Sequence, residues 1–398
     1  MRLALPLLAA LVSACSSGAR PAAAPSTPTN PGGSAPGAPV VVPRTVVTPG
    51  SAADIDELFA QASERQAAGA AAEAATGFDR VYRLDSDGPR AAEALHQGGL
   101  SHEQAGNRES SLQRFEQVAS RFPKHALARD ALLRAIRLAC FLERWRRCGE
   151  ASELFMTRYP DRDYLESIVA HGGKALWRVS EGDVDGASYN IEKARTLVEE
   201  HRLDAAGKIP RDVAQLYFAL GEVRRLRAEK IRFNPLPANF PAVLEERCQL
   251  LLDSQSAYSD SMRAHDAHWS AMAGYRVGEL YQKLHEDLMD VHQPKADTDK
   301  RKQLFEGAMR LRYSILLDKA LTMMEHTLSM ALRTAEKSTW VDKATDATAK
   351  LKRAQKAEND AIARLPYSRA DLQAALDDLA KKADEKAKAD EKKKASGR

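Results

Sequence analysis

Aromatic residues make up only 6% of the chain, and cysteine occurs four times in 398 residues. The low aromatic content, together with 29% charged residues and abundant Ala, Leu, Arg and Glu, is typical of a helical protein and not of a sheet protein. The net charge is +4, and the last eighteen residues carry an excess of four positive charges by themselves. The rest of the chain is therefore balanced, which does not indicate a nucleic-acid-binding surface.

Recognisable catalytic motifs are also missing. The sequence has no Gly-x-Gly-x-x-Gly, no Gly-rich phosphate loop, no nucleophile elbow and no Cys-x-x-Cys. His265 and His268 are spaced for one face of a helix, but we expect them to pack beside Trp269 and not to bind a metal. We therefore predict no catalytic residue, no metal ligand, no cofactor and no small-molecule substrate, and a protein that is not an enzyme.

Long apolar runs are limited to Leu3–Ala14, which is too short to span a membrane because a spanning helix needs about 20 residues. Arg2 precedes this run, and the small residues Ser13 and Ala14 end it. A charged start, an apolar middle and a small-residue end predict a signal peptide over 1–14.

The stretch Val12-Ser13-Ala14-Cys15 resembles the lipobox of bacterial lipoproteins. The resemblance implies that Cys15 becomes the first residue of the mature chain and carries the lipid, palmitate included. Ser16 follows it, in place of the Asp that often retains such proteins at the inner membrane. The expected location is the outer membrane, lipid-anchored and facing the periplasm.

A proline-rich stretch follows the lipidation site. Eight prolines lie between Pro21 and Pro49, and their fixed φ and missing N–H groups exclude a helix or a central strand. Residues 15–53 are predicted to be an extended, polyproline-like linker that holds the folded part away from the lipid.

The folded part shows an internal repeat. Pro89, Pro123 and Pro160 are separated by 34 and 37 residues, a period typical of a solenoid of helix pairs. In the clearest unit a glycine marks the close crossing of the two helices, a small residue faces it, and apolar residues fill the space between units. These positions are Leu95, Gly99, Ser111, Phe115, Val118 and Pro123.

This pattern resembles the tetratricopeptide repeat (TPR). Weaker matches include Phe155 with Pro160, Gly221 and Gly278, and in all they cover about residues 54–340. The resemblance implies an all-α, TPR-like helical-hairpin solenoid, and the C-terminal part is similar to TPR lipoproteins of myxobacteria. An irregular helical bundle with accidental spacing is the alternative.

Domain boundaries are expected where prolines cluster. The predicted parts are an N-terminal array over 54–232, a C-terminal helical region over 233–365 and a charged tail over 366–398. The prolines at 235, 237 and 241 mark either a bend in the solenoid or a break between two arrays. The run 299–365 predicts two helices, and Ser368 is expected to cap a helix that continues into the tail. The tail either forms a solvated helix or binds anionic lipid or cell-wall polymer through its lysines.

Two cysteines and one arginine-rich turn complete the candidate residues. Cys140 and Cys148 either form a disulfide or pack as two buried thiols, and Cys248 is expected in the core. Trp and Arg are common in protein-binding hot spots, and two groups of residues in this sequence are therefore candidates for partner binding. The first group lies in one turn: Arg144, Trp145, Arg146 and Arg147. The second is predicted to point outward on the concave face made by the first helices of each unit: His102, Arg134 and Arg137.

The leading interpretation is a scaffold that binds envelope proteins and helps to assemble an envelope complex. Related repeat lipoproteins suggest outer-membrane assembly, division, secretion or gliding motility as its setting. The alternative is a peptidoglycan-acting enzyme or a cell-wall-binding protein with a helical-repeat platform. A periplasmic solute-binding protein would need strands between the helices, and the sequence pattern does not predict them.

Overall fold

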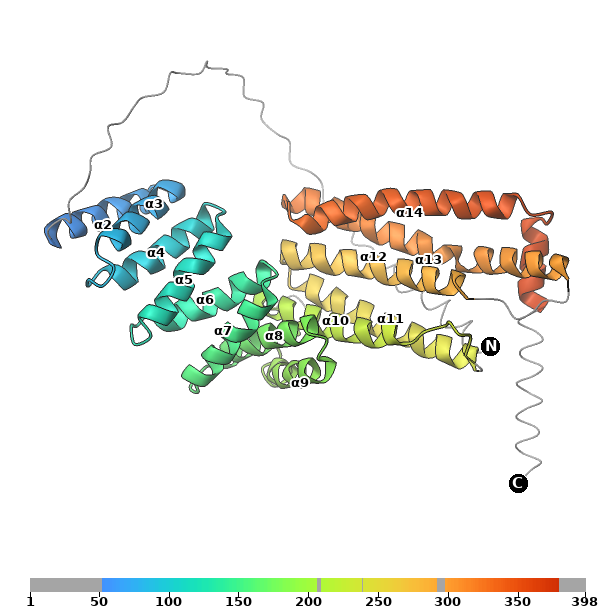
Figure 1. Cartoon of the computed structure of the whole chain (residues 1–398), viewed down its shortest axis with the longest axis horizontal. Coiled ribbons are helices and arrows are strands. Elements are labelled where there is room, and N and C mark those ends of the chain that lie inside the picture. The colour runs from blue at the N-terminus through green and yellow to red at the C-terminus, as the bar shows by residue number, and fades with distance from the viewer. Residues whose placement is uncertain (1–51, 206–208, 238, 292–297, 379–398) are drawn as a thin grey trace, which may run out of the picture. The chain divides into compact units, whose positions relative to one another are not determined.

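The computed structural model describes residues 52–205, 209–237, 239–291 and 298–378 (Figure 1). These ranges contain helices and no strand, so the predicted all-α class is confirmed for the described part of the chain. The predicted signal peptide, the predicted lipidation site Cys15, nearly all of the proline-rich stretch and the end of the tail lie outside the described residues. None of the described helices is apolar over enough residues to cross a membrane.

The helices form two compact units, divided between residues 127 and 128. The N-terminal unit contains the first four helices: α2 (Ala52–Ala67), α3 (Ala71–Leu84), α4 (Ala91–Gln104) and α5 (Arg108–Arg121). The C-terminal unit contains α6 (Ala128–Phe141), α7 (Trp145–Arg158), α8 (Tyr164–Ser180), α9 (Val184–Glu200), the short 3-10 helix η1 (Arg211–Val213), α10 (Ala214–Lys230), α11 (Phe240–Arg263), α12 (Ala267–Met289), α13 (Asp299–Thr334) and α14 (Thr339–Ala363).

The proposed boundary at residues 232 and 233 needs correction. It falls in the connection between α10 and α11, and these two helices pack closely along each other inside the C-terminal unit. The prolines of this connection therefore end one helix of a hairpin and begin the other, and they do not separate two arrays. The two helices predicted for 299–365 are confirmed as α13 and α14.

Helices of the C-terminal unit pack in sequence order and also in alternation. Each helix contacts the next, and α6, α8, α10, α12 and α14 additionally contact one another as successive pairs (Figure 1). The even-numbered helices therefore form one layer, here called the inner layer, and α7, α9, α11 and α13 lie outside it. This alternation is the packing of a TPR-like helical-hairpin solenoid, in which neighbouring units share one core.

The second repeat unit shows how the sequence specifies this packing. A Cβ atom at Gly99 of α4 would lie 2.9 Å from Cε1 of Phe115 in α5, which is closer than side chains normally approach. The Ser111 hydroxyl donates a hydrogen bond to the Gly99 carbonyl oxygen over 2.8 Å. Leu95, Phe115 and Val118 are buried around this crossing.

The same arrangement recurs in later hairpins. A Cβ atom at Gly221 of α10 would lie 2.5 Å from the ring of Tyr258 in α11, and one at Gly278 of α12 would lie 2.6 Å from Met324 in α13. In each case a bulky residue of the second helix occupies the space beside a glycine of the first. Phe155 of the third unit is also fully buried, and Pro123 and Pro160 each lie two residues beyond a helix end.

Gly99→Leu is expected to destabilise the α4–α5 hairpin by about 1–3 kcal/mol, because the new side chain overpacks against Phe115. Amide hydrogen exchange over 91–121 should be faster by about 5- to 150-fold, since each 1.4 kcal/mol is a factor of ten. Gln104→Leu is the matched control, because Gln104 lies on the same helix and is exposed. Equal exchange in the parent and Gly99→Leu would show that the helices do not cross here.

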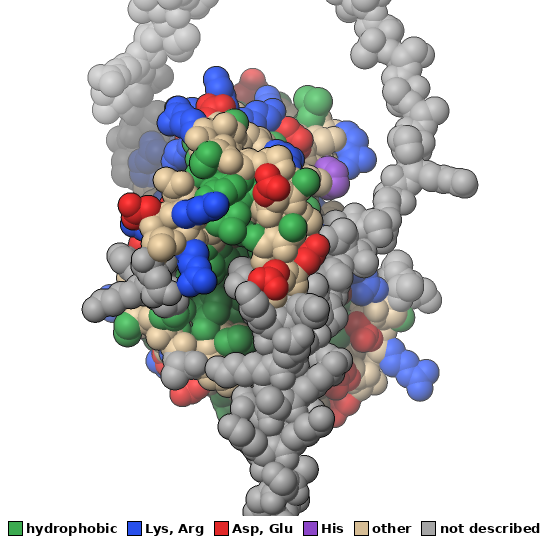
Figure 2. Space-filling view, turned by 90° about the vertical axis from the view of Figure 1, so that its right-hand side faces the viewer, with side chains coloured by type: hydrophobic (Ala, Val, Ile, Leu, Met, Phe, Trp, Pro, Cys, Tyr) green, Lys and Arg blue, Asp and Glu red, His purple; other side chains and the backbone are tan. Residues whose placement is uncertain are grey.

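A final helix covers the end of the C-terminal unit. Residues 369–378 are helical, and Ser368 caps this helix as expected, because its hydroxyl accepts the Asp371 N–H while the Asp371 carboxylate accepts the Ser368 N–H. Leu372 is fully buried in contact range of Gly307 in α13. Figure 2 looks onto this end and shows a strip of hydrophobic side chains between charged ones.

Cys140 and Cys148 form a disulfide, with Cα atoms 5.4 Å apart, and both residues are fully buried. The alternative of two separate buried thiols therefore does not hold. Cys248 is buried and unpaired, as expected, and burial raises the pKa of its thiol to about 11. The disulfide joins the end of α6 to the start of α7 and spans the turn that carries Trp145.

Candidate functional site

A cavity of about 260 Å³ opens on the inner layer of the C-terminal unit, and we call it the inner pocket. Its walls are contributed by α8, α10, α12 and α14 and by the α6–α7 turn, but by none of α9, α11 and α13. Trp145 is the first residue of α7, so the pocket lies where the inner layer meets the start of one outer helix. The lining residues are Glu143, Trp145, Leu176, Val179, Ser180, Phe218, Glu222, Arg225, Leu226, Met272, Arg276 and Trp340.

Trp145 is an aromatic residue of the pocket whose ring and indole N–H are not engaged by other described residues of the protein. It is half-buried at the start of α7 and lines the cavity. Within the described residues its ring has no aromatic or cation contact and its indole N–H has no hydrogen-bond partner, whereas Phe218 packs against Tyr258 and Trp269. A half-exposed Trp with a free donor is suited to contact a ligand.

Trp340 forms the opposite side of the pocket and is tied to the α6–α7 turn. Its indole N–H donates a hydrogen bond to the Glu143 carboxylate over 2.8 Å. Arg276 lies 5.2 Å and Lys343 lies 3.6 Å from the centre of the Trp340 ring, so this ring is already engaged by cations of the chain. The hydrogen bond between Glu143 and Trp340 joins residues 197 positions apart. It places the start of α14 beside the α6–α7 turn, where the inner layer begins.

Glu143 has a backbone conformation that its position in the repeat explains. Its φ is 58°, in the left-handed region that costs a residue with a Cβ about 1–2 kcal/mol. The corresponding turns of three other hairpins use Gly69, Gly106 and Gly182, with φ of 78°, 82° and 77°. In all four turns the next residue donates its N–H to the carbonyl five residues earlier: Ala70 to Arg65, Asn107 to His102, Arg144 to Ala139 and Asp183 to Arg178.

A glutamate therefore stands where three other hairpins have glycine, and its carboxylate accepts the Trp340 N–H at a wall of the pocket. Arg202, His265 and Ala335 have the same left-handed backbone, with φ between 51° and 55°, so this conformation alone does not mark a functional site. The sequence carried the signal, because Gly69 and Gly106 are 37 residues apart and the next step of 37 leads to Glu143.

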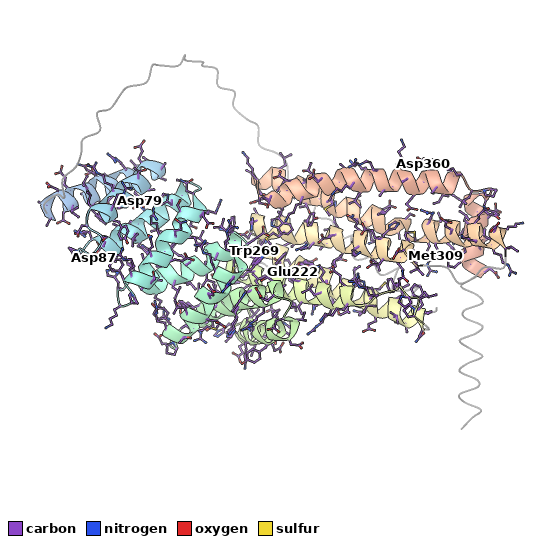
Figure 3. The ribbon with its side chains drawn as sticks, viewed as in Figure 1. Asp79, Asp87, Glu222, Trp269, Met309 and Asp360 are labelled. Carbon is purple, nitrogen blue, oxygen red and sulfur yellow. A yellow bond between two sulfur atoms is a disulfide. The ribbon has the colours of Figure 1, made fainter. Side chains whose placement is uncertain are left out.

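The floor of the pocket is a buried charge cluster around Glu222 of α10. Figure 3 labels Glu222 on its helix. One carboxylate oxygen of Glu222 lies 2.9 Å from Nε of Arg276 and accepts the Tyr258 hydroxyl over 2.6 Å, and the other accepts an N–H of Arg225 over 2.8 Å. Arg225 also pairs with Glu229 at 2.9 Å. The charges of the floor are thus matched within the protein.

Burial opposes ionisation of Glu222, but Arg276 and Arg225 outweigh it and hold the pKa of the carboxyl below its ordinary value. The pKa of Tyr258 is raised well above its usual range, mainly by burial and secondly by the nearby Glu222 carboxylate. The phenol therefore stays a neutral hydrogen-bond donor. A carboxylate that is fully hydrogen-bonded and ion-paired is poorly suited to accept a proton from a substrate. The cluster therefore serves to shape the pocket.

Glu222 should make the stability of the C-terminal unit sensitive to acid. Because its pKa is lowered by folding, its contribution is present above the pKa of the unfolded carboxyl, about 4.3, and is lost as the pH falls through the folded value. The difference in unfolding free energy between the parent and Glu222→Gln should therefore narrow from pH 6 to pH 3. Urea titrations followed by tryptophan fluorescence test this, and a constant difference would contradict it.

A second hollow lies beside the inner pocket, between α12 and α14. It measures about 250 Å³ and is lined by residues of both charges: Tyr275, Glu279, Gln282, Lys283, Glu286, Lys343, Asp346, Ala347 and Lys350. Tyr275 and Trp340 connect the two hollows, with ring centres 5.4 Å apart. We call this second hollow the α12–α14 groove.

The predicted binding residues divide into two groups. Trp145 lines the inner pocket, and Arg146 beside it is 79% exposed and pairs with Glu150. Arg144 is exposed, and Arg147 is partly buried near the start of α7. The sequence thus located one side of the pocket, whereas Trp340 and the Glu222 cluster were missed because they lie far from this turn in the chain.

The second group is engaged in ion pairs: His102 is largely buried, whereas Arg134 and Arg137 are partly exposed, Arg137 with 38% of its side chain. His102 is 12% exposed and its Nε2 lies 3.1 Å from Asp79 in the N-terminal unit. Arg137 makes two contacts of 2.7 Å with the Asp212 carboxylate, which fasten α6 to η1. Arg134 is 35% exposed and pairs with Asp130 on its own helix.

Groups that could hold a metal ion were sought among His, Cys, Asp and Glu. No cluster of three or more such residues occurs in the described part of the chain. His268 is buried and stacks on Phe141 with ring centres 3.8 Å apart, beside Trp269.

Comparison with known proteins gives limited similarity. No protein-family model matches the chain, and no curated protein matches it. Among solved structures, a tetratricopeptide repeat protein from Parabacteroides merdae is 12% identical, with 74% of this chain and 99% of that chain covered and a TM-score of 0.38. A circular tandem repeat protein is also 12% identical, with 78% of each chain covered and a TM-score of 0.20. These scores do not establish a common fold, so the solenoid rests on the helix packing of this chain.

Proposed function

We propose that this protein is a lipid-anchored, TPR-like adaptor that binds a segment of another protein on its inner layer. The observation that carries the proposal is the inner pocket, where four alternate helices and one turn converge on the unused ring of Trp145. Superhelices of paired helices commonly bind extended peptides or helices on such a face. We expect the site to bind a partner and not to catalyse a reaction, because the charged groups of its floor form ion pairs with one another.

The setting of the proposal comes from the sequence. The signal-like segment 1–14, the lipobox ending at Cys15 and the proline-rich linker fit an outer-membrane lipoprotein that faces the periplasm. An adaptor held there would meet envelope proteins, and its role would be to help assemble an envelope complex. Outer-membrane assembly, division, secretion and gliding motility are the settings that we consider.

Cys15→Ala is expected to release the protein from membranes. Several acyl chains anchor firmly because each buried methylene contributes about 0.8 kcal/mol, and the variant has no acceptor thiol for them. Fractionation of cells into membrane and soluble parts measures the effect. A variant that stays entirely in the membrane fraction would contradict lipid anchoring at Cys15.

Partner binding is tested by photo-crosslinking in cells, with a benzophenone amino acid in place of Gln282 in the α12–α14 groove. The matched control carries the same group at Leu332 of α13, which is 85% exposed and lines neither hollow. We expect Gln282 to yield adducts with one or a few envelope proteins, identified by mass spectrometry, and Leu332 to yield none of them. Equal adducts at both positions, or none at Gln282, would contradict the proposal.

A further inference from the structure

The inner pocket favours a particular kind of occupant. Its charged floor is internally paired, with Glu222 bound to Arg225 and Arg276, and the Glu143 carboxylate accepts the Trp340 N–H. An ion entering the pocket would lose its water and find no unmatched counter-charge, which is costly. An uncharged occupant that offers a hydrogen-bond acceptor to the free indole N–H of Trp145 avoids this cost.

Proline-rich segments fit that description. Proline rings pack against aromatic side chains, and the carbonyl groups of a polyproline helix are free to accept hydrogen bonds because the helix has none of its own. Such a segment also loses little conformational entropy on binding, since its backbone is already restricted. Tryptophan-lined grooves are a common way of recognising it.

The chain itself contains such a segment. Residues 21–49 include eight prolines and a single charged residue, Arg44, so the segment is nearly neutral, like the internally paired pocket. With Pro25–Pro36 in the pocket, the 15 residues 37–51 would connect it to the start of α2 and could span up to about 45 Å at about 3 Å each. A covalently linked ligand also has an effective concentration of about millimolar, so weak intrinsic binding is sufficient.

We infer that the inner pocket binds the proline-rich segment 21–49 of the same chain, with Trp145 as the contact residue and Glu143 as the positioning residue. Glu143 fixes the Trp340 wall, because its carboxylate accepts the indole N–H. The folded-back linker shortens the distance between the anchor and the folded units. A partner that enters the pocket has to displace it.

The test uses purified full-length protein with a benzophenone amino acid at Val179, which lines the pocket, or at the exposed control position Leu332. After irradiation, mass spectrometry should map adducts from position 179 to residues 21–49, and position 332 should give none there. A mixture of ¹⁴N- and ¹⁵N-labelled protein should show adducts within single chains. Adducts between chains, adducts to another protein in place of 21–49, or none to this segment would overturn the inference.

Variants separate binding from folding. Glu143→Gly restores the turn residue of the other hairpins, so relief of strain offsets the lost hydrogen bond and the fold is retained. Its adduct yield at 21–49 should fall by about tenfold, the effect of losing about 1.4 kcal/mol of positioning. Glu143→Gln keeps an acceptor for Trp340 and should keep the yield. Replacing Pro25, Pro28, Pro31 and Pro36 by Ala should also lower the yield.

An unchanged yield in Glu143→Gly and in the proline variant would overturn the inference. The proposed adaptor function is tested independently at Gln282. Envelope-protein adducts at Gln282 without linker adducts at Val179 would support the adaptor function and contradict only the binding of the linker in the pocket.

Discussion

Glu222→Ala is expected to destabilise the C-terminal unit by about 3–5 kcal/mol, the usual cost of removing one member of a buried ion cluster. The variant leaves Arg276 and Arg225 without their shared carboxylate and leaves the Tyr258 hydroxyl without its acceptor. Arg225 keeps Glu229 and Arg276 keeps Glu279 as a partner, so the effect comes from the buried hydrogen bonds and the shared counter-charge that are lost together.

The measurement is urea unfolding followed by tryptophan fluorescence, which reports the C-terminal unit because all four tryptophans lie between residues 145 and 340. The matched control is Glu150→Ala, which removes a surface partner of Arg146 and should leave the unfolding midpoint essentially unchanged. If the two variants had the same midpoint, the Glu222 cluster would not be a buried network.

Replacing Cys140 and Cys148 by Ala is expected to lower the stability of the C-terminal unit by about 2–3 kcal/mol. The disulfide closes a short loop, with a sequence separation of 8, and restricts the unfolded chain accordingly. It also spans Glu143 and Trp145, so its loss should loosen the turn that carries two residues of the inner pocket.

Fluorescence-detected urea unfolding of the oxidised and the fully reduced parent gives the same comparison without a mutation. Cys248→Ala serves as a control in both states, since Cys248 is the unpaired cysteine of the described residues and should leave the difference between them unchanged. Equal stability of the oxidised and reduced protein would mean that the crosslink does not constrain the folded unit.

Much of the fold was predictable because local sequence rules and tertiary packing agree in the repeats. Gly99, Ser111 and Phe115 were assigned to one helix crossing from their spacing, and they meet there. The segment 299–365 was divided correctly into two helices by its apolar period. The domain boundary failed, because prolines mark the ends of helices whether the next helix belongs to the same unit or to another.

The site was less predictable, because its parts are distant in sequence. Trp145 was identified from residue type in an arginine-rich turn, but nothing near Trp340 indicates that it meets the same pocket 197 residues after Glu143. The pairing of Glu222 with Arg276 likewise depends on how α10 lies beside α12 in the inner layer. His102 and Arg137 were placed outward from helical phase alone, which gives direction but not the presence of an acidic partner on a neighbouring element.

The central claim is that alternate helices form one layer that brings α14 back to the α6–α7 turn. A double-mutant cycle between Glu143 and Trp340, built from Glu143→Gly, Trp340→Phe and the double variant, tests it most directly. We expect a coupling free energy of about 1–2 kcal/mol from urea unfolding, as for a hydrogen bond to a charged acceptor in contact. A coupling indistinguishable from zero would mean that the two residues do not meet, and would contradict both the layered fold and the pocket.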